Sequence, residues 1–506
     1  MAEKGAQWSS RFGFIIASLG MAFGAGNIWR FPREAAANGG GPFLIAFIFA
    51  NLIWAVPLLM IEMIMGRSTR LGTNGAFRDF VGKKHTWMGV WTGFCCVLIM
   101  FYYSVVTGWA IRYFIFGLSG VVRRGVDSEA LWRGFLASPA QTIFFHLIAI
   151  ALACFIIIGG VHKGLERANK IIVPSIVVIL AAVMVWALTK PGAFRGLEYL
   201  FRPDLMGLLK AKTWLSAFTQ AAWSVGAGWG LMLTYSVYMS EREDIAANSF
   251  VIAFADSGSS LLAGMAVLPL VFAVSPGPEA AVRALQSGDT GLTFIYLTKF
   301  FPSLPAGSFV AALFFLALAV SAMASLLSMV ELAVRNLSDA GISRKKAAVL
   351  TSVVAFLCGI PSAVNINIQA NQDMVWGVGL LISGVFFSIA VYKNGIDRVR
   401  GMINELSWIH VGKWFNACVL AIPAVFFCVF GWWVGQAVTW YPKTWWNPFE
   451  KLSPGTMFLQ WAALIALVLA ANNWFARRVR GPYLPPRPPG GKRDRGEPAA
   501  FKGGDV

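Results

Sequence analysis

Two glycine-rich stretches place oxygen-bearing side chains inside long apolar segments. The first covers residues 20–27 and ends at Asn27, and the second covers residues 223–230 and contains Ser224. Glycine permits a helix to unwind, and an unwound turn exposes carbonyl groups at one half-helix end and N–H groups at the other. Carbonyl, amide and hydroxyl oxygens suit a hard cation such as sodium, whereas N–H groups at the positive end of a helix dipole suit a carboxylate. The pattern predicts a sodium site beside a carboxylate site.

The composition indicates that these stretches lie within a membrane. The chain has 506 residues, of which 57% are hydrophobic and 13% charged, and its mean hydropathy is +0.64. Soluble proteins carry about 25% charged residues, so a secreted or cytosolic protein is excluded. The net charge of +18 is better explained by membrane topology and contact with anionic lipid than by nucleic-acid binding. Lipid tolerates unwound backbone only where it is buried in protein or lines a cavity, so both breaks should face such a cavity.

The apolar segments predict an all-α polytopic membrane protein. An even number of spans, twelve as given next, puts both termini on one side of the membrane. The excess of Lys and Arg in the loops and tail of that side predicts that it is cytoplasmic. We expect twelve membrane-spanning helices, at residues 11–36, 41–68, 86–117, 139–158, 168–189, 214–238, 245–273, 307–336, 346–360, 371–393, 412–436 and 455–476.

The two breaks fall in the first and sixth predicted spans, so five spans separate their starts. An odd number inverts the second unit relative to the first, which predicts a five-plus-five inverted repeat with two appended helices. The expected organisation is a cytoplasmic segment at 1–10, a transporter core at 11–393, two further helices at 394–476 and a disordered basic tail at 477–506. The 274–306 loop has amphipathic character and is expected to form short helices.

Few ionisable side chains lie within the predicted spans. Each is costly there unless it is paired, so each is either functional or a structural partner of the backbone or of another helix. For Glu62 the structural interpretation is favoured. The set consists of Arg30, Glu62, Asp256, Glu331 and Asp373. The six cysteines are expected to be small core residues, and no nucleophile–base pair or metal-binding set accompanies the breaks, which argues against an enzyme.

Short motifs along the chain resemble the neurotransmitter:sodium symporter family, and its bacterial, LeuT-like amino acid transporters in particular. The resemblance extends over about residues 8–410 and implies a LeuT-like fold with broken first and sixth helices, in a bacterial plasma membrane. The residues that carry it include Trp8, Arg11, Gly24, Gly26-Asn27, Arg30-Phe31-Pro32, Asn38-Gly39-Gly40-Gly41, Ile61-Glu62, Met65-Gly66-Arg67, Tyr102-Tyr103, Lys163-Gly164-Leu165-Glu166-Arg167, Gln220, Tyr235, Tyr238 and Ser343-Arg344-Lys345.

The resemblance implies two sodium sites. The first would use the carbonyl of Ala22 and the side chains of Asn27, Ser224 and Asp256, together with the substrate carboxylate. The second would use carbonyls of Gly20, Phe23 and Ser321 and the hydroxyl of Ser325.

The resemblance also assigns a substrate site and two gates. The substrate carboxylate would meet the N–H groups around Ala25 and Gly26 and the hydroxyl of Tyr103. The residues expected around the substrate side chain carry no charge, which implies a neutral amino acid. Gly24 stands where monoamine carriers place an aspartate. The substrate site would comprise Met21, Ala22, Ala25, Gly26, Ile99, Tyr103, Trp223, Ser224, Gly226, Trp229, Ser325 and Met329. Arg30 and Asp373 would form the outer gate, and Trp8, Tyr238 and Asp339 the inner gate.

Several positions depart from the family pattern. Ala324 removes a hydroxyl from the second sodium site unless Ser321 turns its own hydroxyl inward. Asp256 stands where an asparagine is usual, and Phe47 replaces a tyrosine of the chloride site, which together predict chloride independence. Gly5 replaces the arginine of the inner gate, and Lys4 is a poorer substitute, because an ammonium cannot form the fork that a guanidinium makes with a carboxylate.

The favoured function is sodium-coupled import of a neutral amino acid by alternating access. One alternative keeps the fold but uses one sodium ion or proton-linked exchange through Asp256. An alternative of another class is an amino-acid sensor without net flux. The size of the substrate stays open: Gly226 makes room and Trp229 takes it away, and Trp223 and Trp229 could stack on an aromatic substrate or simply pack.

Overall fold

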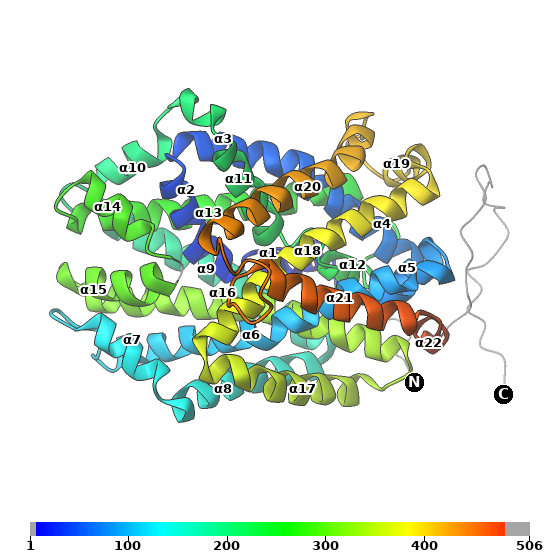
Figure 1. The fold of residues 1–506 in the computed structure, drawn as a ribbon, viewed down its shortest axis with the longest axis horizontal. Helices are drawn as coiled ribbons and strands as arrows, with labels where there is room; N and C mark the ends of the chain where they lie inside the picture. Colours follow the sequence, from blue (N-terminus) through cyan, green and yellow to red (C-terminus); the bar gives the residue numbers. More distant parts are fainter. Residues whose placement is uncertain (1–6, 289, 481–506) are drawn as a thin grey trace.

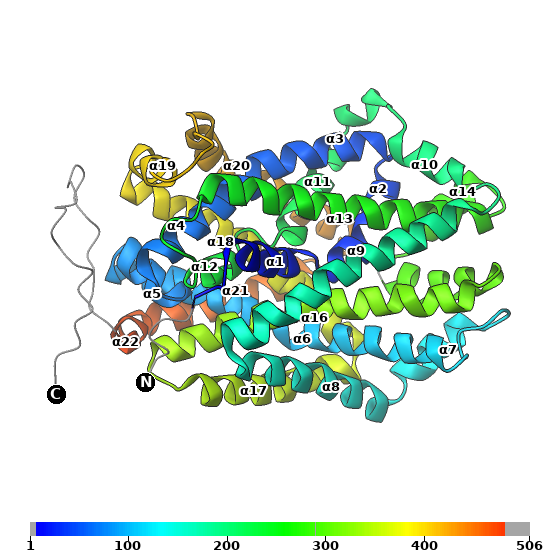
Figure 2. The same cartoon turned by 180° about the vertical axis from the view of Figure 1, so that it is seen from behind.

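The computed structural model describes residues 7–288 and 290–480, and the regular structure of these residues is helical. The predicted tail at 477–506 lies outside the described residues from position 481 onward, and most of the predicted N-terminal segment, including Lys4 and Gly5, lies outside them as well. Figures 1 and 2 show the helices running roughly side by side as a bundle, with α8 and α17 along one edge and α3 along the other.

Nine helical segments of residues 7–288 and 290–480 are long and apolar enough to cross a membrane. Three of them contain a π- or 3-10-helical turn. They are Gly41–Thr69 (α3 Gly41–Ala50, η2 Asn51–Ala55, α4 Val56–Thr69), Lys83–Leu118 (η3 Lys83–His85, α6 Thr86–Leu118), α8 Pro139–Ile158, Val161–Leu188 (η4 Val161–Glu166, α9 Arg167–Leu188), α13 Ile245–Val274, α16 Gly307–Asp339, α17 Arg344–Val364, α18 Ile366–Asn394 and α20 Trp414–Trp440.

Two further spans are bent pairs. The first joins α1 (Arg11–Ala22) to η1 (Gly26–Arg30) and α2 (Phe31–Ala37) at an angle of 52°, and the last joins α21 (Pro454–Ala470) to α22 (Asn472–Arg478) at 59°. The sixth predicted span is α11 (Ala211–Ser224) and α12 (Leu231–Ser236), joined by residues 225–230. The breaks in the first and sixth spans therefore lie where the glycines predicted them.

Several predicted spans differ from the structure at their ends; the tenth, for example, was expected at 371–393, but α18 runs from Ile366 to Asn394. The ninth was expected at 346–360, but α17 runs from Arg344 to Val364. Its first residues are basic rather than apolar, and at the other end the helix continues through Pro361. The twelfth was expected to be continuous to 476, but it bends after α21, and α22 continues to Arg478, inside the predicted tail.

The remaining helices cover the two ends of the bundle. One end of the bundle, here called the α7 end, carries α7, α10 and α14. The opposite end, here called the α22 end, carries α22, α5 and α19 (Figures 1 and 2). The 274–306 segment forms short helices, as its sequence predicts. The helices at the two ends of the bundle, those of the 274–306 segment included, are α5 Thr73–Phe80, α7 Ser128–Leu136, α10 Phe194–Phe201, η5 Leu205–Leu209, α14 Pro278–Leu285, η6 Gly291–Leu297, α15 Thr298–Phe300, η7 Phe301–Ser303 and α19 Ile396–Asn404.

The second break is a loop whose backbone requires glycine. Gly226, Gly228 and Gly230 have φ angles of +69°, +90° and +78°, a region that other residues rarely adopt. The carboxylate of Glu62, fully buried in α4, accepts hydrogen bonds from the N–H groups of Gly228 at 2.6 Å and Leu233 at 3.0 Å. Glu62 is therefore a structural partner of the broken helix, which confirms the interpretation favoured from sequence.

Close packing of α6 against α8 depends on a glycine. A Cβ atom added to Gly108 would lie 2.7 Å from the carbonyl carbon of Phe145 and 2.8 Å from the backbone nitrogen of His146. We expect Gly108→Ala to destabilise the protein by about 1–3 kcal/mol, because backbone cannot yield as a flexible side chain does. Thermal unfolding in detergent, followed by intrinsic fluorescence, measures this.

Gly258→Ala in α13 is the matched control, since a Cβ atom there meets no atom within 4 Å. Its melting temperature should stay unchanged or rise slightly, as expected when glycine is replaced by a better helix former. Equal melting temperatures for the two variants would contradict the packing argument.

Candidate functional site

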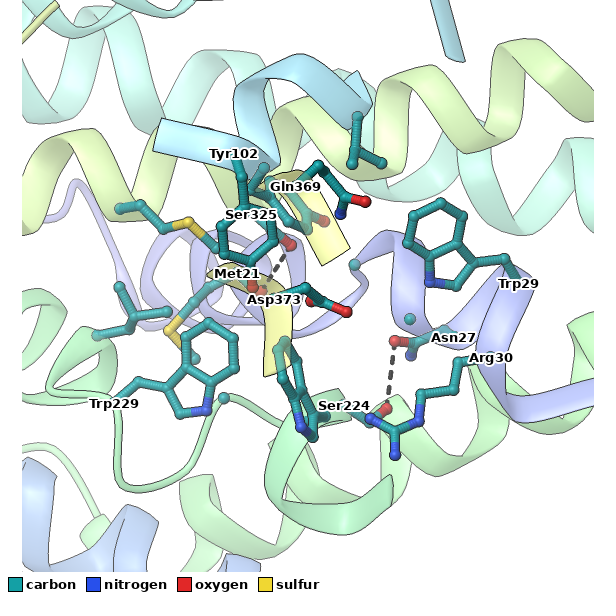
Figure 3. A pocket seen from close by; sticks show the side chains of 18 residues that line it. Met21, Asn27, Trp29, Arg30, Tyr102, Ser224, Trp229, Ser325, Gln369 and Asp373 are labelled. Atoms are coloured by element: carbon teal, nitrogen blue, oxygen red, sulfur yellow. Dashed lines mark hydrogen bonds between the residues drawn. The ribbon is translucent and has the colours of Figure 1, made fainter. Parts of the chain in front are cut away.

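A cavity lies between the two breaks, near the middle of the bundle. The empty space between its walls is about 720 Å³, open solvent at its mouth included. Figure 3 shows side chains from both broken helices and from α6, α16 and α18 converging on it. It is lined by Met21, Gly24, Gly26, Asn27, Trp29, Arg30, Tyr102, Tyr103, Val106, Trp223, Ser224, Gly226, Trp229, Leu231, Ser325, Met329, Gln369 and Asp373.

One wall carries a buried cluster of oxygen-bearing side chains. Asn27 donates to the Asp256 carboxylate (Nδ2–Oδ1 2.6 Å) and to the Ser259 hydroxyl at 2.8 Å. Ser224 donates to the other carboxylate oxygen at 2.7 Å and lies 3.2 Å from the amide oxygen of Asn27. The structure thus brings together the three side chains that the resemblance assigned to the first sodium site. Ser259 was not predicted, although it lies three residues after Asp256 and hence on the same helix face.

A second group of oxygens lies where α1 unwinds against α16. The Ser321 hydroxyl donates to the Phe23 carbonyl at 2.5 Å, and the Ser325 hydroxyl donates to the Met21 carbonyl at 3.2 Å. Ser321 therefore turns its hydroxyl toward the unwound turn, the condition under which the loss of a hydroxyl at Ala324 is offset. Both serines are buried.

The backbone of the first break is arranged to receive a small polar group. The N–H of Ala25 donates to the Tyr103 hydroxyl at 3.2 Å. A Cβ atom on Gly24 would lie 2.8 Å from the Ser325 hydroxyl and 3.6 Å from that of Tyr103, so the absence of a side chain at Gly24 keeps this space open. The N–H groups predicted to meet a carboxylate thus adjoin the cavity beside both oxygen clusters.

The rest of the cavity is mostly apolar. Trp223 and Trp229 are in edge-to-face contact, with ring centroids 5.4 Å apart, so they pack on each other. Ile99 is fully buried and is not among the residues that line the cavity. Val106 and Leu231 line it and were not predicted. Val106 lies one helical turn from Tyr103, a spacing that could have revealed it.

The two residues assigned to the outer gate, Arg30 and Asp373, line the same cavity. The guanidinium of Arg30 lies 3.7 Å from the Glu34 carboxylate and 5.7 Å above the ring of Trp223. Figure 3 shows Asp373 projecting into the space between Met21 and Asn27. Both side chains are partly exposed, so the mouth of the cavity lies on their side.

Just before α1, Trp8 is bonded to the chain at the end of α12. The Trp8 indole donates to the Tyr235 carbonyl at 3.0 Å, and its backbone N–H donates to the Tyr238 carbonyl at 3.2 Å. The Tyr238 hydroxyl donates at 2.7 Å to Glu331, which also forms a two-pronged ion pair with Arg344. Trp8 and Tyr238 therefore meet as the resemblance predicts.

Asp339, the third residue assigned to the inner gate, is held within the bundle. Its carboxylate pairs with Arg335 at 2.7 Å and accepts the N–H of Gly72 at 2.6 Å. The guanidinium of Arg335 lies 5.6 Å from the centre of the Tyr238 ring, which connects Asp339 to the other gate residues. The sequence did not single out Arg335 or Gly72.

Comparison with known proteins agrees with this architecture. The chain matches the sodium:neurotransmitter symporter family over residues 5–123 and 138–476. It is 32% identical over 432 residues to an uncharacterised sodium-dependent transporter of Methanocaldococcus jannaschii, with 81% of this chain and 86% of that protein covered. It is 27% identical over 305 residues to a sodium-dependent neutral amino acid transporter of Homo sapiens, with 53% and 41% covered.

A solved structure shares the fold. The structure of MhsT in complex with L-phenylalanine matches with a TM-score of 0.73 at 29% identity, covering 84% of this chain and 98% of that chain. The predicted LeuT-like, all-α membrane fold is thereby confirmed. The chain belongs to the sodium:neurotransmitter symporter family and is a multi-pass, sodium-dependent transporter, not an enzyme.

Proposed function

We propose that this chain is a symporter that imports a neutral amino acid together with sodium, without chloride, by alternating access. The observation that carries the proposal is the cavity between the two breaks, where Asn27, Ser224 and Asp256 meet the unwound backbone beside Tyr103. A carboxylate bound at Ala25 and Gly26 would adjoin the first oxygen cluster. Sodium and substrate would then stabilise each other's binding, which is what coupling requires.

Two sodium ions fit the oxygen clusters. The first would bind at the side chains of Asn27, Ser224 and Asp256 and the carbonyl of Ala22. The second would bind at the carbonyls of Gly20 and Phe23 and at the oxygens of Ser321 and Ser325. The inward hydroxyl of Ser321 favours two ions over the alternative of one, because it replaces the oxygen missing at Ala324.

The apolar walls support a neutral, hydrophobic substrate. Met21, Val106, Trp229, Leu231 and Met329 surround the space beyond the carboxylate site, and the charged residues lie at the mouth. A hydrophobic side chain would gain from leaving water, whereas a charged one would meet no partner on these walls. The bound phenylalanine of MhsT and the neutral amino acid transporter of Homo sapiens accord with this class.

In alternating access, the cavity would open toward one side of the membrane while its other side is closed, and then the reverse. The α22 end is closed by Trp8, Tyr238 and Asp339, while Arg30 and Asp373 flank the mouth. We place the α22 end and both termini in the cytoplasm of a prokaryotic cell, as the Lys and Arg distribution predicts. The conformation then corresponds to a transporter closed toward the cytoplasm.

The central test is a thermal-shift experiment on the purified protein. L-phenylalanine and L-leucine should raise the melting temperature in NaCl but not in KCl, and L-glutamate and L-lysine should have no effect. A ligand at a hundred times its Kd stabilises the folded state by about 2.7 kcal/mol, so the shift is readily measured. Stabilisation of equal size in KCl would refute sodium coupling, and sodium-driven uptake into proteoliposomes separates transport from sensing.

The second sodium site is tested by Ser321→Ala. Loss of a buried hydroxyl ligand costs about 1 kcal/mol, so the sodium concentration for half-maximal uptake should rise about fivefold. Ser328→Ala is the control, since Ser328 is buried in the same helix and its hydroxyl donates to the Ala324 and Ser325 carbonyls of that helix. Equal sodium dependence of both variants would contradict the role proposed for Ser321.

Chloride independence is tested by Asp256→Asn. The unsubstituted protein should transport equally in chloride and gluconate, because the buried carboxylate supplies the negative charge beside sodium. The variant should lose most of its uptake in gluconate and retain more in chloride, whereas Asp397→Asn, at an exposed position of α19, should behave like the unsubstituted protein. Chloride-dependent uptake with Asp256 intact would refute the proposal.

A further inference from the structure

The last helix, α22, leaves the bundle axis at the end of a membrane span. It bends by 59° from α21, whose outer face exposes Leu467 and Leu469. Trp474, the third residue of α22, is 55% exposed. Tryptophan prefers the interface between hydrocarbon and headgroups, so α22 lies at the level of the lipid headgroups.

An open cavity on α22 gathers positive charge. It is lined by Ala340, Asn473, Trp474, Arg477, Arg478 and Arg480, so three guanidinium groups border one space. The guanidinium of Arg478 lies 5.1 Å from the centre of the Trp474 ring, which holds it near the interface. Figure 1 shows α22 at one extreme of the bundle, beyond α21.

Two described acidic residues that adjoin these elements in the chain are already neutralised. Asp79 pairs with Arg78 at 2.6 Å, and Asp339 pairs with Arg335 at 2.7 Å, and both acids are buried. The helix itself, residues 472–478, contains no acidic residue. Within residues 7–288 and 290–480, no ion pair joins Arg477, Arg478 or Arg480 to an acidic side chain, so their charge can attract an external anion.

The ends of α22 are bonded to the parts that close the inner end. The Arg78 guanidinium in α5 donates to the Val479 carbonyl at 2.9 Å, and the N–H of Arg480 donates to the Asp339 carbonyl at 2.7 Å. At the other end, the Asn472 side chain accepts the N–H of Trp87 at 2.9 Å. An anion bound at the arginines would thus brace the segment that holds Asp339.

We propose that this cavity binds the phosphate of an anionic phospholipid and thereby stabilises the closed α22 end. Guanidinium groups suit phosphate because they donate parallel hydrogen bonds. The cavity adjoins the exposed apolar face of α21, along which the acyl chains of the same lipid lie. A free anion would use the arginines alone, whereas a phospholipid also uses Trp474 and the α21 face. The proposal does not depend on which substrate is transported.

The test uses the full chain in nanodiscs of phosphatidylcholine, with or without phosphatidylglycerol. The combined variant Arg477→Gln, Arg478→Gln and Arg480→Gln keeps the backbone N–H of residue 480 and removes three charges. The control, Arg123→Gln, Arg124→Gln and Arg195→Gln, removes three exposed charges elsewhere. The readouts are phosphatidylglycerol retained in native mass spectrometry, melting temperature, and hydrogen exchange of residues 7–13 and 66–72.

The unsubstituted protein and the control should retain phosphatidylglycerol, melt at a higher temperature with it and exchange more slowly in both segments. The combined variant should bind it about 10- to 100-fold more weakly, since each basic residue near a membrane surface contributes to lipid attraction. Equal losses in variant and control would overturn the proposal. Inorganic phosphate that protects the protein as well as phosphatidylglycerol would also overturn it, because the site would then bind a free anion.

Discussion

The structure depends on one constraint: backbone polar groups released inside a membrane bundle must find partners. Water cannot serve in the hydrocarbon region, and each unpaired group is costly. Glu62 takes the N–H groups of Gly228 and Leu233, and the Tyr103 hydroxyl takes that of Ala25. Serine hydroxyls on α16 donate to the carbonyls of Met21 and Phe23. Each break is thus held open by side chains from unbroken helices.

The same constraint explains how the breaks would form the binding site that we propose. A carbonyl oxygen has two lone pairs, so one that accepts a single hydrogen bond keeps a further acceptor position. Asn27 uses its amide N–H groups on Asp256 and Ser259, which directs its oxygen toward Ser224. The buried negative charge of an ionised Asp256 then favours a cation nearby, because attraction is strong where water is excluded. The fold thereby prepares oxygens and charge before any ligand arrives.

The sequence predicted the breaks because two glycine clusters lie in matching spans, five spans apart, and the resemblance to a known family assigned the full oxygen cluster. It did not reveal the bend after α21, since no glycine or proline marks it, and only the paired Asn472 and Asn473 interrupt the apolar run. Leu231 was missed for a different reason. The direction in which the Leu231 side chain points depends on the preceding loop, which contains three glycines with positive φ. The path of that loop is set by tertiary contacts such as the hydrogen bond from Gly228 to Glu62.

The elements at the α22 end are held together by many individually weak hydrogen bonds. Trp8 is held by two hydrogen bonds to backbone carbonyls, Arg70 donates to the carbonyls of Val237 and Met239, and Arg480 donates to that of Asp339. A typical hydrogen bond contributes about 1 kcal/mol, because water replaces it when it breaks. A closure of this kind can therefore open one contact at a time at moderate cost. An end closed by a large apolar interface would have no such intermediate steps, so the polar contacts of the α22 end support the gate that we propose there.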